Sequence, residues 1–595
     1  MKSNLRTPMP EQMSIAAEWR MPQTSGRICP ENHAAGNRMS RTCLKGGMIC
    51  DPTNGIDGLI ANLWMEDGRI IAAPDDPSER AEVTIDVTGM VVMAGGVDMH
   101  CHIAGPKVNT ARKMLPQQRR KTPPIPRTRL TRSGTLGSVP STFATGYLYA
   151  GLGYTTAFDA AVPPIGARHA HDELQDTPLL DAGFYVMMGN NHLVMERLRE
   201  GNQELLDGTV SWLLNSTGGY AVKLVNPGGV EVWKEGGRGF CGLDEELPFP
   251  GLTARTIIRE MAAAADRLQT PHPVHVHCNQ LGMPGNWTTT LETMMATEGS
   301  RAHLTHIQFH SYGGHTDDQS TFCSQVPALA DYVNQHPHLT VDVGQVMFGE
   351  TTSMTGDGPL GHYLHRVTGK RWFNGEVELE GGCGIVPIVY RDRSFVHSLQ
   401  WAVGLEWYLL VENPWQIAMS TDHPNGGSFL AYPEIIALLM DRARREEYLS
   451  RMPDRLRAAC TLGDLEREYT LAEIAIITRA APARMLGLNH KGHLGPGADA
   501  DVTVYSRNDD PETMFRFPRY VFRRGRMIID DGEIRAVTDG RTVMTQTEKN
   551  PDVEPLIEDW FDRNSSIQFA NFPVDNHDVG EHTVTIEAGG EKKSG

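Results

Sequence analysis

The 595-residue sequence lacks the features that would place it in common binding classes. No apolar run reaches the roughly eighteen residues that a membrane-spanning helix needs. The net charge of −18 is the opposite of the basic excess that general nucleic-acid or membrane-surface binding requires. No GxxxxGKS or GxxxxGKT loop is present, which excludes the phosphate site of P-loop proteins. We therefore expect a protein that binds neither nucleic acid nor membranes.

Closely spaced cysteine pairs are also missing. The nine cysteines are scattered, and none forms a Cys-x-x-Cys pair. This spacing disfavours a disulfide framework and an iron–sulfur cluster, and it fits a reducing compartment. The first twenty residues lack the apolar core of a secretory signal. The sequence therefore predicts a cytoplasmic protein with no electron transfer through this chain.

The two ends of the chain differ from its middle. Residues 1–45 are polar and rich in Pro, Met and Arg, which predicts a flexible or partner-bound arm. Residues 46–95 alternate short apolar runs with turn sequences, and residues 486–545 repeat this pattern. We therefore predict one small β-sandwich domain built from both ends. The polar tail, 546–595, is expected to be extended or disordered.

Residues 96–485 alternate strand-like and helix-like segments, which is typical of an α/β fold. Residues 221–225 (AVKLV) predict a buried strand. Thr253 is a suitable N-cap for a helix that leads into a second strand, 274–279 (VHVHCN). Polar residues follow the apolar runs, where the top face of a barrel would place them. We therefore predict a TIM-like (β/α)8 barrel rather than a doubly wound sheet.

Potential metal ligands follow five of these predicted strands. Two histidines spaced i, i+2 on a strand point to the same side, and imidazoles and carboxylates are ligands for zinc. A lysine in such a set is explained if its buried amine has reacted with carbon dioxide, which makes it an anionic bridge between two metals. The candidate ligands are His100, His102, Lys223, His277, His306 and Asp422.

The segments around these candidates resemble a known family. AVKLVNPGG (221–229), VHVHCNQLG (274–282), HLTHIQFHSYGG (303–314) and STDHPNGGSF (420–429) are similar to the A subunit of formylmethanofuran dehydrogenase. They are equally similar to the A subunit of the bacterial formyltransferase/hydrolase complex, and both belong to the amidohydrolase superfamily. KGHLGPGADADVTVY (491–505) resembles the signature that closes the composite β-domain. The resemblance covers about residues 46–540.

The resemblance implies a role for each candidate ligand. It implies that His100 and His102 bind one zinc ion and that His277 and His306 bind a second. Carboxylated Lys223 would bridge the two, while Asp422 would bind the first metal and act as general base. The implied reaction is hydrolysis of an N-formyl methanofuran- or methylofuran-type cofactor to formate and free amine, within a complex of one-carbon metabolism. Water activated at the metals would attack the formyl carbon.

Other polar residues lie beside the candidate ligands. Asn226, Asn279 and His310 are expected either to hold the substrate or to fix the ligands through hydrogen bonds. His275 shares a strand face with His277 and is expected to support the ligands or to lie in the core. The pair His169 and His171 follows a predicted loop, which favours a surface or subunit-contact role.

One basic stretch stands out in this acidic protein. Residues 107–132 contain nine lysines and arginines and no acidic residue. Carriers of this family have a glutamate tail, and arginine suits repeated carboxylates, so we expect Arg119 and Arg120 to bind that tail. Contact with an acidic partner protein is the alternative.

Three other functions remain open at this point. The first is the role of the corresponding subunit in formylmethanofuran dehydrogenase, where formate and methanofuran condense within a redox complex. The second is a hydantoinase- or dihydroorotase-like cyclic amidohydrolase. The third is a non-catalytic scaffold that has kept the fold, although the complete set of candidate ligands disfavours it.

Overall fold

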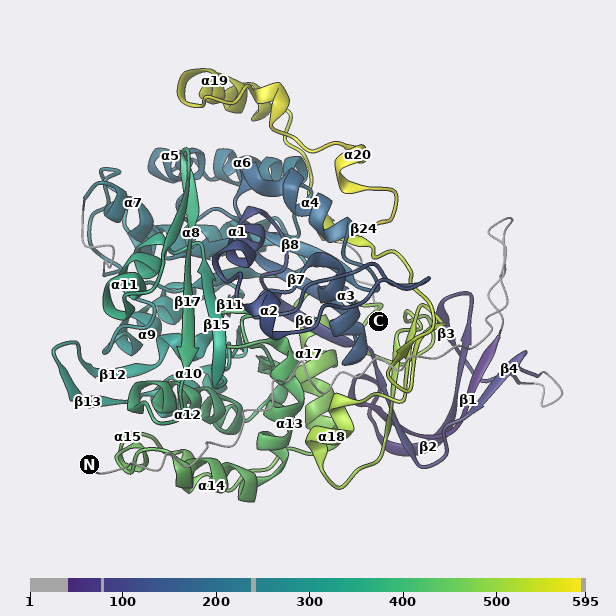
Figure 1. Ribbon diagram of the computed structural model, residues 1–595. Helices are drawn as coiled ribbons and strands as arrows, with labels where there is room; N and C mark the ends of the chain where they lie inside the picture. Colours follow the sequence, from purple (N-terminus) through teal and green to yellow (C-terminus); the bar gives the residue numbers. More distant parts are fainter. Residues whose placement is uncertain (1–40, 76–79, 237–241, 590–595) are drawn as a thin grey trace.

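The computed structural model describes residues 41–75, 80–236 and 242–589 of the chain (Figure 1). The predicted arm, residues 1–45, therefore lies outside the described residues except for its last few positions. Those positions are not an arm, because strand β1 (Thr42–Asp51) already begins within them.

A barrel of eight parallel strands forms the centre of the molecule, in the order β6-β7-β8-β9-β10-β11-β14-β18. An isolated parallel bridge between Cys101 and His423 brings the last strand back to the first. The predicted TIM-like barrel is therefore confirmed. Its strands are β6 (Gly96–Cys101), β7 (Tyr154–Val162), β8 (Asp181–Met187), β9 (Ala221–Val225), β10 (Val274–His277), β11 (Ala302–Leu304), β14 (Leu339–Asp342) and β18 (Ile417–Ala418).

Helices pack side by side around the barrel. The helix predicted after Thr253 is present, and the Thr253 side chain accepts a hydrogen bond from the backbone N–H of Thr256 as its N-cap. The main core lies between these helices and the strands. The surrounding helices include α4 (Ala167–Gln175), α5 (His192–Glu200), α6 (Gln203–Thr217), α8 (Ala254–Arg267), α9 (Trp287–Ala296), α10 (Val326–Gln335), α12 (Phe395–Leu410), α13 (Tyr432–Met440) and α14 (Arg442–Arg451).

Both chain ends contribute to a second sheet, in which purple and yellow-green strands lie together in Figure 1. The two ends join where β5 pairs antiparallel with β19. The predicted composite domain is present as one mixed sheet of nine strands, in the order β22-β21-β20-β19-β5-β1-β2-β3 with β4 beside β1. Its other strands are β2 (Ile56–Glu66), β3 (Arg69–Ile71), β4 (Val83–Asp86), β5 (Met90–Ala94), β19 (Val502–Ser506), β20 (Tyr520–Arg523), β21 (Arg526–Asp530) and β22 (Glu533–Ile534).

A buried network of charges joins this sheet to the barrel. Asp181, at the start of β8, lies 2.9 Å from the Lys491 ammonium and 2.5 Å from the Arg541 guanidinium. The same ammonium lies 2.7 Å from Asp501. Buried carboxylates need paired charges of this kind. The acidic cluster here is therefore neutralised by the chain's own cations and needs no metal ion.

A long insertion separates the last two barrel strands. It contains β15 (Gly349–Thr355), α11 (Gly358–Thr368), β16 (Phe373–Val377) and β17 (Glu380–Tyr390), whose strands form a separate antiparallel sheet. In Figure 1 the long strands β15 and β17 cross in front of the barrel. The sequence did not predict this unit, which supplies part of the site described below.

The prediction of an extended or disordered C-terminal tail is wrong for its described part. Residues up to 589 form β23 (Thr542–Gln546), α19 (Glu554–Asn564), α20 (Asn576–Val579) and β24 (Thr583–Glu587). Strand β24 pairs with β23, and β23 pairs with β8 of the barrel sheet. Aromatic packing explains the order, because Phe569 and Phe572 stack on Trp212 of α6.

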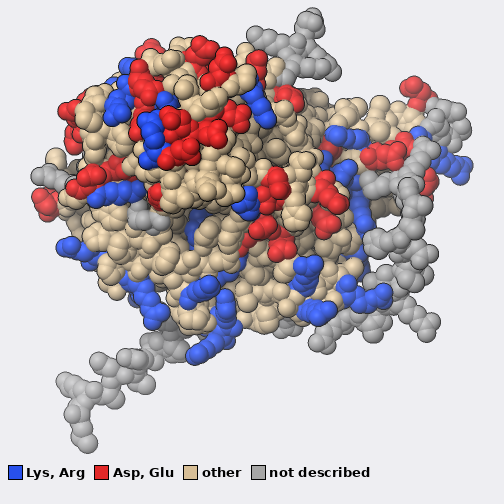
Figure 2. Space-filling model, turned by 90° about the horizontal axis from the view of Figure 1, so that it is seen from above, with Lys and Arg blue, Asp and Glu red and all other residues tan. Residues whose placement is uncertain are grey.

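The apolarity of the helices and the distribution of surface charge indicate what the protein can contact. Within the described residues, no helix combines the length and apolarity needed to cross a membrane. Figure 2 shows acidic side chains gathered over one part of the face seen from above, with lysines and arginines mostly along another edge. Several lysines and arginines also lie among the acidic side chains, so the two signs are only partly separated on this face.

Candidate metal centre

The closing of the barrel brings the first three candidate ligands together. His100 lies near the end of β6, His102 follows that strand, and Asp422 follows β18. The backbone N–H of His102 donates to the His423 carbonyl at 2.6 Å, which fixes the two strand ends side by side. The Asp422 Oδ1 atom lies 2.9 Å from His100 Nε2 and 3.0 Å from His102 Nε2. These residues therefore form a buried group that can hold a metal ion.

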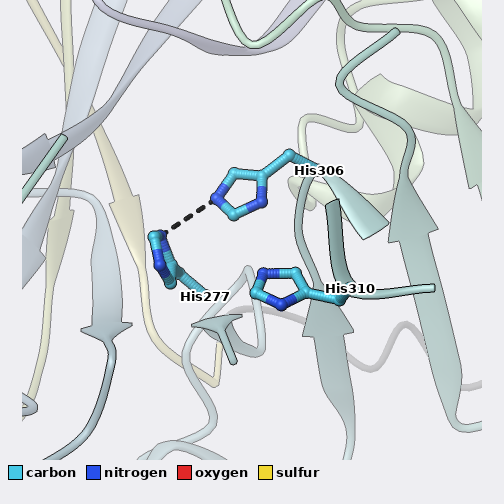
Figure 3. A group of neighbouring side chains, drawn as sticks. All are labelled: His277, His306 and His310. Carbon is cyan, nitrogen blue, oxygen red and sulfur yellow. Dashed lines mark hydrogen bonds between the residues drawn. The ribbon is translucent and has the colours of Figure 1, made fainter. Parts of the chain in front are cut away.

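A second group lies on the neighbouring strands (Figure 3). His277 ends β10, and His306 follows β11. The Nδ1 atom of His277 and the Nε2 atom of His306 are 3.1 Å apart. His310 joins them, with one ligand atom of each residue lying within 4.8 Å of the others. The structure thus brings together both pairs of histidines predicted from the sequence.

Lys223 is the buried lysine of the predicted set. It lies on β9 in register with His275 of β10. Its ammonium nitrogen has no hydrogen-bond partner among the described residues. Burial lowers the pKa of Lys223 to about 7, despite the opposing charges of Asp342 and Asp422. An unpaired amine that loses its proton near neutral pH can react with carbon dioxide.

The charges around His100 also favour a cation. Burial lowers the pKa of the His100 imidazole, but the carboxylates of Asp342 and Asp422 outweigh that effect and raise the pKa to about 9. Two buried carboxylates at one imidazole require a positive charge, supplied by a proton or a metal ion. Imidazoles, a carboxylate and an unpaired lysine are the donor set that a pair of zinc ions with a carboxylated lysine requires. The residues present therefore fit that group.

Asp342 belongs to the site but was not among the candidates. This buried residue ends β14, and its carboxylate accepts from His100 Nδ1 at 3.1 Å and from His303 Nε2 at 3.0 Å. Its other oxygen accepts from Ser420 Oγ at 2.5 Å and from the His306 backbone N–H at 3.1 Å. Asp342 therefore fixes His100 while leaving His100 Nε2 directed at Asp422. Its sequence context, LTVDVG, has the same apolar-run pattern as the predicted ligands.

His275 lies behind the ligands, in the position expected for a supporting or core histidine. Its Nε2 atom is 3.2 Å from His100 Nδ1, and its Nδ1 atom is 2.9 Å from His272 Nε2. His272 in turn contacts the Met485 carbonyl at 2.8 Å. These buried imidazoles fill the barrel interior below the site.

The insertion contributes a second supporting carboxylate, Asp357, which the sequence did not indicate. Asp357 Oδ2 lies 3.3 Å from His277 Nε2, and Asp357 Oδ1 accepts from Asn226 Nδ2 at 3.2 Å. Asn279 donates to Asn226 Oδ1 at 3.0 Å. This chain of bonds holds His277 with its Nδ1 atom directed at His306. The contacts of Asn226 and Asn279 favour the ligand-fixing role over direct substrate binding.

Replacing Asp357 with asparagine should weaken metal binding about 10–100-fold. An amide cannot accept hydrogen bonds from all three donors that surround this carboxylate, which include the Leu360 backbone N–H. Zinc retained after dialysis against a graded chelator measures the effect. Asp331→Asn, at an exposed carboxylate on α10, is the matched control. Equal zinc retention in the two variants would show that Asp357 does not position His277.

The backbone at the site is unusual. Asn226, His306 and Asp422 have positive φ angles of 43°, 35° and 51°, a region that L residues rarely adopt. Gly344 is required beside His306, because a Cβ atom there would lie 2.4 Å from the His306 Cβ. Such sharp turns at strand ends aim the side chains inward, across the barrel mouth.

Both groups open into one cavity of about 370 Å³. Its lining includes all six predicted ligands, together with apolar and aromatic side chains of the insertion and of β13 (Asp318–Ser324), among them Phe322, Leu360 and Tyr390. A polar floor with apolar walls suits a ligand whose reactive group is polar and whose attached arm is less so.

The remaining predicted residues lie elsewhere. Arg119 and Arg120 are exposed on the short helix α2 (Gln118–Lys121), and neither lines this cavity. Lys107, from the same basic stretch, is buried and pairs with Asp159 at 2.5 Å. The surface role predicted for His171 is wrong, because this residue is buried in α4 and contacts the Thr217 carbonyl at 2.9 Å. Its partner His169 is half-exposed.

Comparison with known proteins supports this description. Residues 83–529 match the model of the amidohydrolase family. Protein FwdA of Methanocaldococcus jannaschii is 41% identical over 92% of this chain and 99% of its own length. The A subunit of the formyltransferase/hydrolase complex Fhc of Methylorubrum extorquens is 38% identical over 92% of this chain and 98% of its own.

A solved structure agrees with these relatives. The formyltransferase/hydrolase complex FhcABCD from Methylorubrum extorquens, in complex with methylofuran, contains a chain with a TM-score of 0.86 and 36% identity. The match covers 92% of this chain and all of that one. The resemblance inferred from the sequence motifs is thereby confirmed. This chain belongs to the amidohydrolase family.

Proposed function

We propose that the chain hydrolyses the N-formyl group of a methanofuran- or methylofuran-type carrier, giving formate and the free amine. The observation that carries this proposal is that two ligand groups and one buried lysine without a hydrogen-bond partner among the described residues line the same cavity. His100, His102 and Asp422 form the first group, and His277 and His306 form the second. Two zinc ions bridged by carboxylated Lys223 would occupy this centre.

The chemistry that such a zinc pair supplies when bound is activation of water near neutral pH and polarisation of a carbonyl oxygen. The chain's own residues supply the proton transfer. Asp422 is buried and ionised, so its carboxylate can take a proton from the attacking water and pass it to the leaving amine nitrogen. Asn425 donates to Asp422 Oδ1 at 2.9 Å and holds the carboxylate in place.

The substrate class follows from the relatives and from the cavity. One relative is a formyltransferase/hydrolase subunit, and the similar solved complex contains methylofuran. The cavity leads from the ligand groups past apolar and aromatic side chains, which suits an aromatic carrier arm ending in a formamide. The similarity to the formyltransferase/hydrolase subunit therefore favours a linear formamide over a cyclic amide.

We further propose that the chain works within a formyltransferase/hydrolase complex in the cytoplasm. The structural similarity to one chain of that complex supports this assignment, and the dehydrogenase remains the alternative, because FwdA is similar to this chain over the same 92% of its length. The seven described cysteines are all free, which suits a reducing compartment.

The exposed arginines of α2 are proposed to bind the anionic tail of the carrier outside the cavity. Reversing both charges, Arg119→Glu with Arg120→Glu, should lower the amount of carrier that copurifies with the complex, because the tail carboxylates would be repelled. Mass spectrometry of the bound carrier measures this, with Arg259→Glu on α8 as the control. Unchanged carrier occupancy would assign the two arginines to a partner contact instead.

The proposed reaction is tested on the complex purified from its own host. Zinc per chain, copurifying subunits and formate released from an N-formyl carrier are measured on the same sample. We expect two zinc ions per chain, and formate release that requires them. Turnover of a hydantoin or dihydroorotate without formate release would assign the chain to cyclic amides. A metal-free, inactive complex would assign it a scaffold role.

A further inference from the structure

His310 is the most unusual of the buried histidines near the site. Its side chain is fully buried, and neither ring nitrogen has a hydrogen-bond partner among the described residues. A neutral imidazole has one donor and one acceptor nitrogen, and leaving both unsatisfied in a protein interior is unfavourable. Both nitrogens of this ring are therefore available to a group bound beside it.

The ring lies beside the second ligand group. Its centroid is 5.2 Å from that of His306, with the planes 26° apart, and 5.4 Å from that of His277. Figure 3 shows the three rings around one small space, with His277 on one side and His306 and His310 on the other. One ligand atom from each lies within 4.8 Å of the other two, so small side-chain shifts bring all three within reach of one metal ion.

The backbone holds the ring firmly in this position. His306 is the N-cap of the single helical turn η4 (Ile307–His310), and His310 is the last residue of that turn. Thr290 Oγ1 donates to the His310 carbonyl at 2.7 Å, and Ser311 Oγ donates to the Ile307 carbonyl at 2.7 Å. Trp407 Nε1 donates to the same Ser311 hydroxyl at 2.8 Å. The turn therefore presents two imidazoles as a fixed pair.

We propose that His310 is a third imidazole ligand of the second metal position, beside His277 and His306. This inference rests on the proposed binuclear zinc site. It replaces the substrate-binding role expected for His310 from the sequence. With carboxylated Lys223, the chain would offer four ligands at this position, three of them imidazoles, and catalytic zinc can expand to five ligands when water binds. The first position has two imidazoles and one carboxylate, so the two metals have different ligand sets.

The experiment measures metal binding directly rather than through activity alone. Wild type, His310→Ala and His310→Asn are purified in the complex and equilibrated with zinc buffered by a chelator. Zinc per chain is then determined at each free zinc concentration. We expect two equivalents in wild type, and binding of one of them weakened at least tenfold in both variants. Cobalt substitution provides a second readout, because losing an imidazole changes the visible spectrum of that cobalt only.

The matched control is His171→Ala, which removes a buried histidine outside the site whose ring contacts a carbonyl. It should keep both zinc equivalents, and circular dichroism shows that each variant is folded. If His310→Ala does not fold, His310→Asn carries the test. If the His310 variants bind two zinc ions per chain with wild-type affinity, His310 is not a ligand, and the binuclear site itself still stands. A raised KM in those variants would not rescue the inference. If the wild-type chain binds fewer than two zinc ions, the proposed binuclear site is wrong, and this inference is wrong with it.

Discussion

Asp422→Asn is expected to lower the rate of formate release by about 10²–10⁴-fold, the usual contribution of a general base. Burial raises the pKa of the Asp422 carboxyl, but the charges of His100 and His306 outweigh it and hold that pKa well below its usual range. The carboxylate is therefore ionised and can accept a proton at neutral pH. An asparagine amide keeps an oxygen near the metal position but cannot take up that proton.

Asp422 is proposed both as general base and as metal ligand, and measuring rate and metal content together separates these two roles. In the variant the rate of formate release should fall by a larger factor than the amount of bound zinc, because His100, His102 and Lys223 remain as ligands. Asp392→Asn changes an exposed carboxylate just beyond β17 and serves as the control for both measurements. Deformylation at a near wild-type rate in Asp422→Asn would show that another group is the base.

The ligands could be predicted because each belongs to a local pattern that can be read from the sequence. His102, Lys223, His277, His306 and Asp422 each lie at or just after a short apolar run, and parallel barrel strands bring such positions to one end. The supporting residues could not be recognised in this way. Asp357 reaches His277 from an insertion whose place over the barrel is set by tertiary packing.

Two wrong predictions have a common physical origin. The polar neighbours of His169 and His171 favour a surface position, but the pair lies on a helix, where i and i+2 side chains point in different directions and His171 faces inward. The overall polarity of the tail predicts disorder. Trp560, Phe561 and Phe572 are nevertheless enough to fix it against the helices of the barrel. In both cases burial is decided by a few side chains rather than by mean composition.

Carbon dioxide is expected to control metal loading through Lys223. Carboxylation requires the neutral amine, and in the metal-free chain the pKa of Lys223 is lowered to about 7. The amine is charged below that value, so about nine-tenths of it is neutral at pH 8 and about one-tenth at pH 6. At equal dissolved carbon dioxide, the part of zinc loading that depends on carbon dioxide should therefore be about tenfold slower at pH 6.

The measurement starts from protein stripped of metal with a chelator. Zinc uptake and recovery of formate release are followed at both pH values, with and without carbon dioxide. Histidine protonation also slows zinc uptake at pH 6, and Lys223→Ala measures that effect separately, since this variant cannot be carboxylated. The variant should bind zinc weakly, with no response to carbon dioxide, and a short-chain carboxylate should restore part of its activity by replacing the missing bridge. Full zinc loading of the wild type at pH 8 without carbon dioxide would contradict the carboxylated lysine, and the bridge between the two ligand groups would then have to come from another residue.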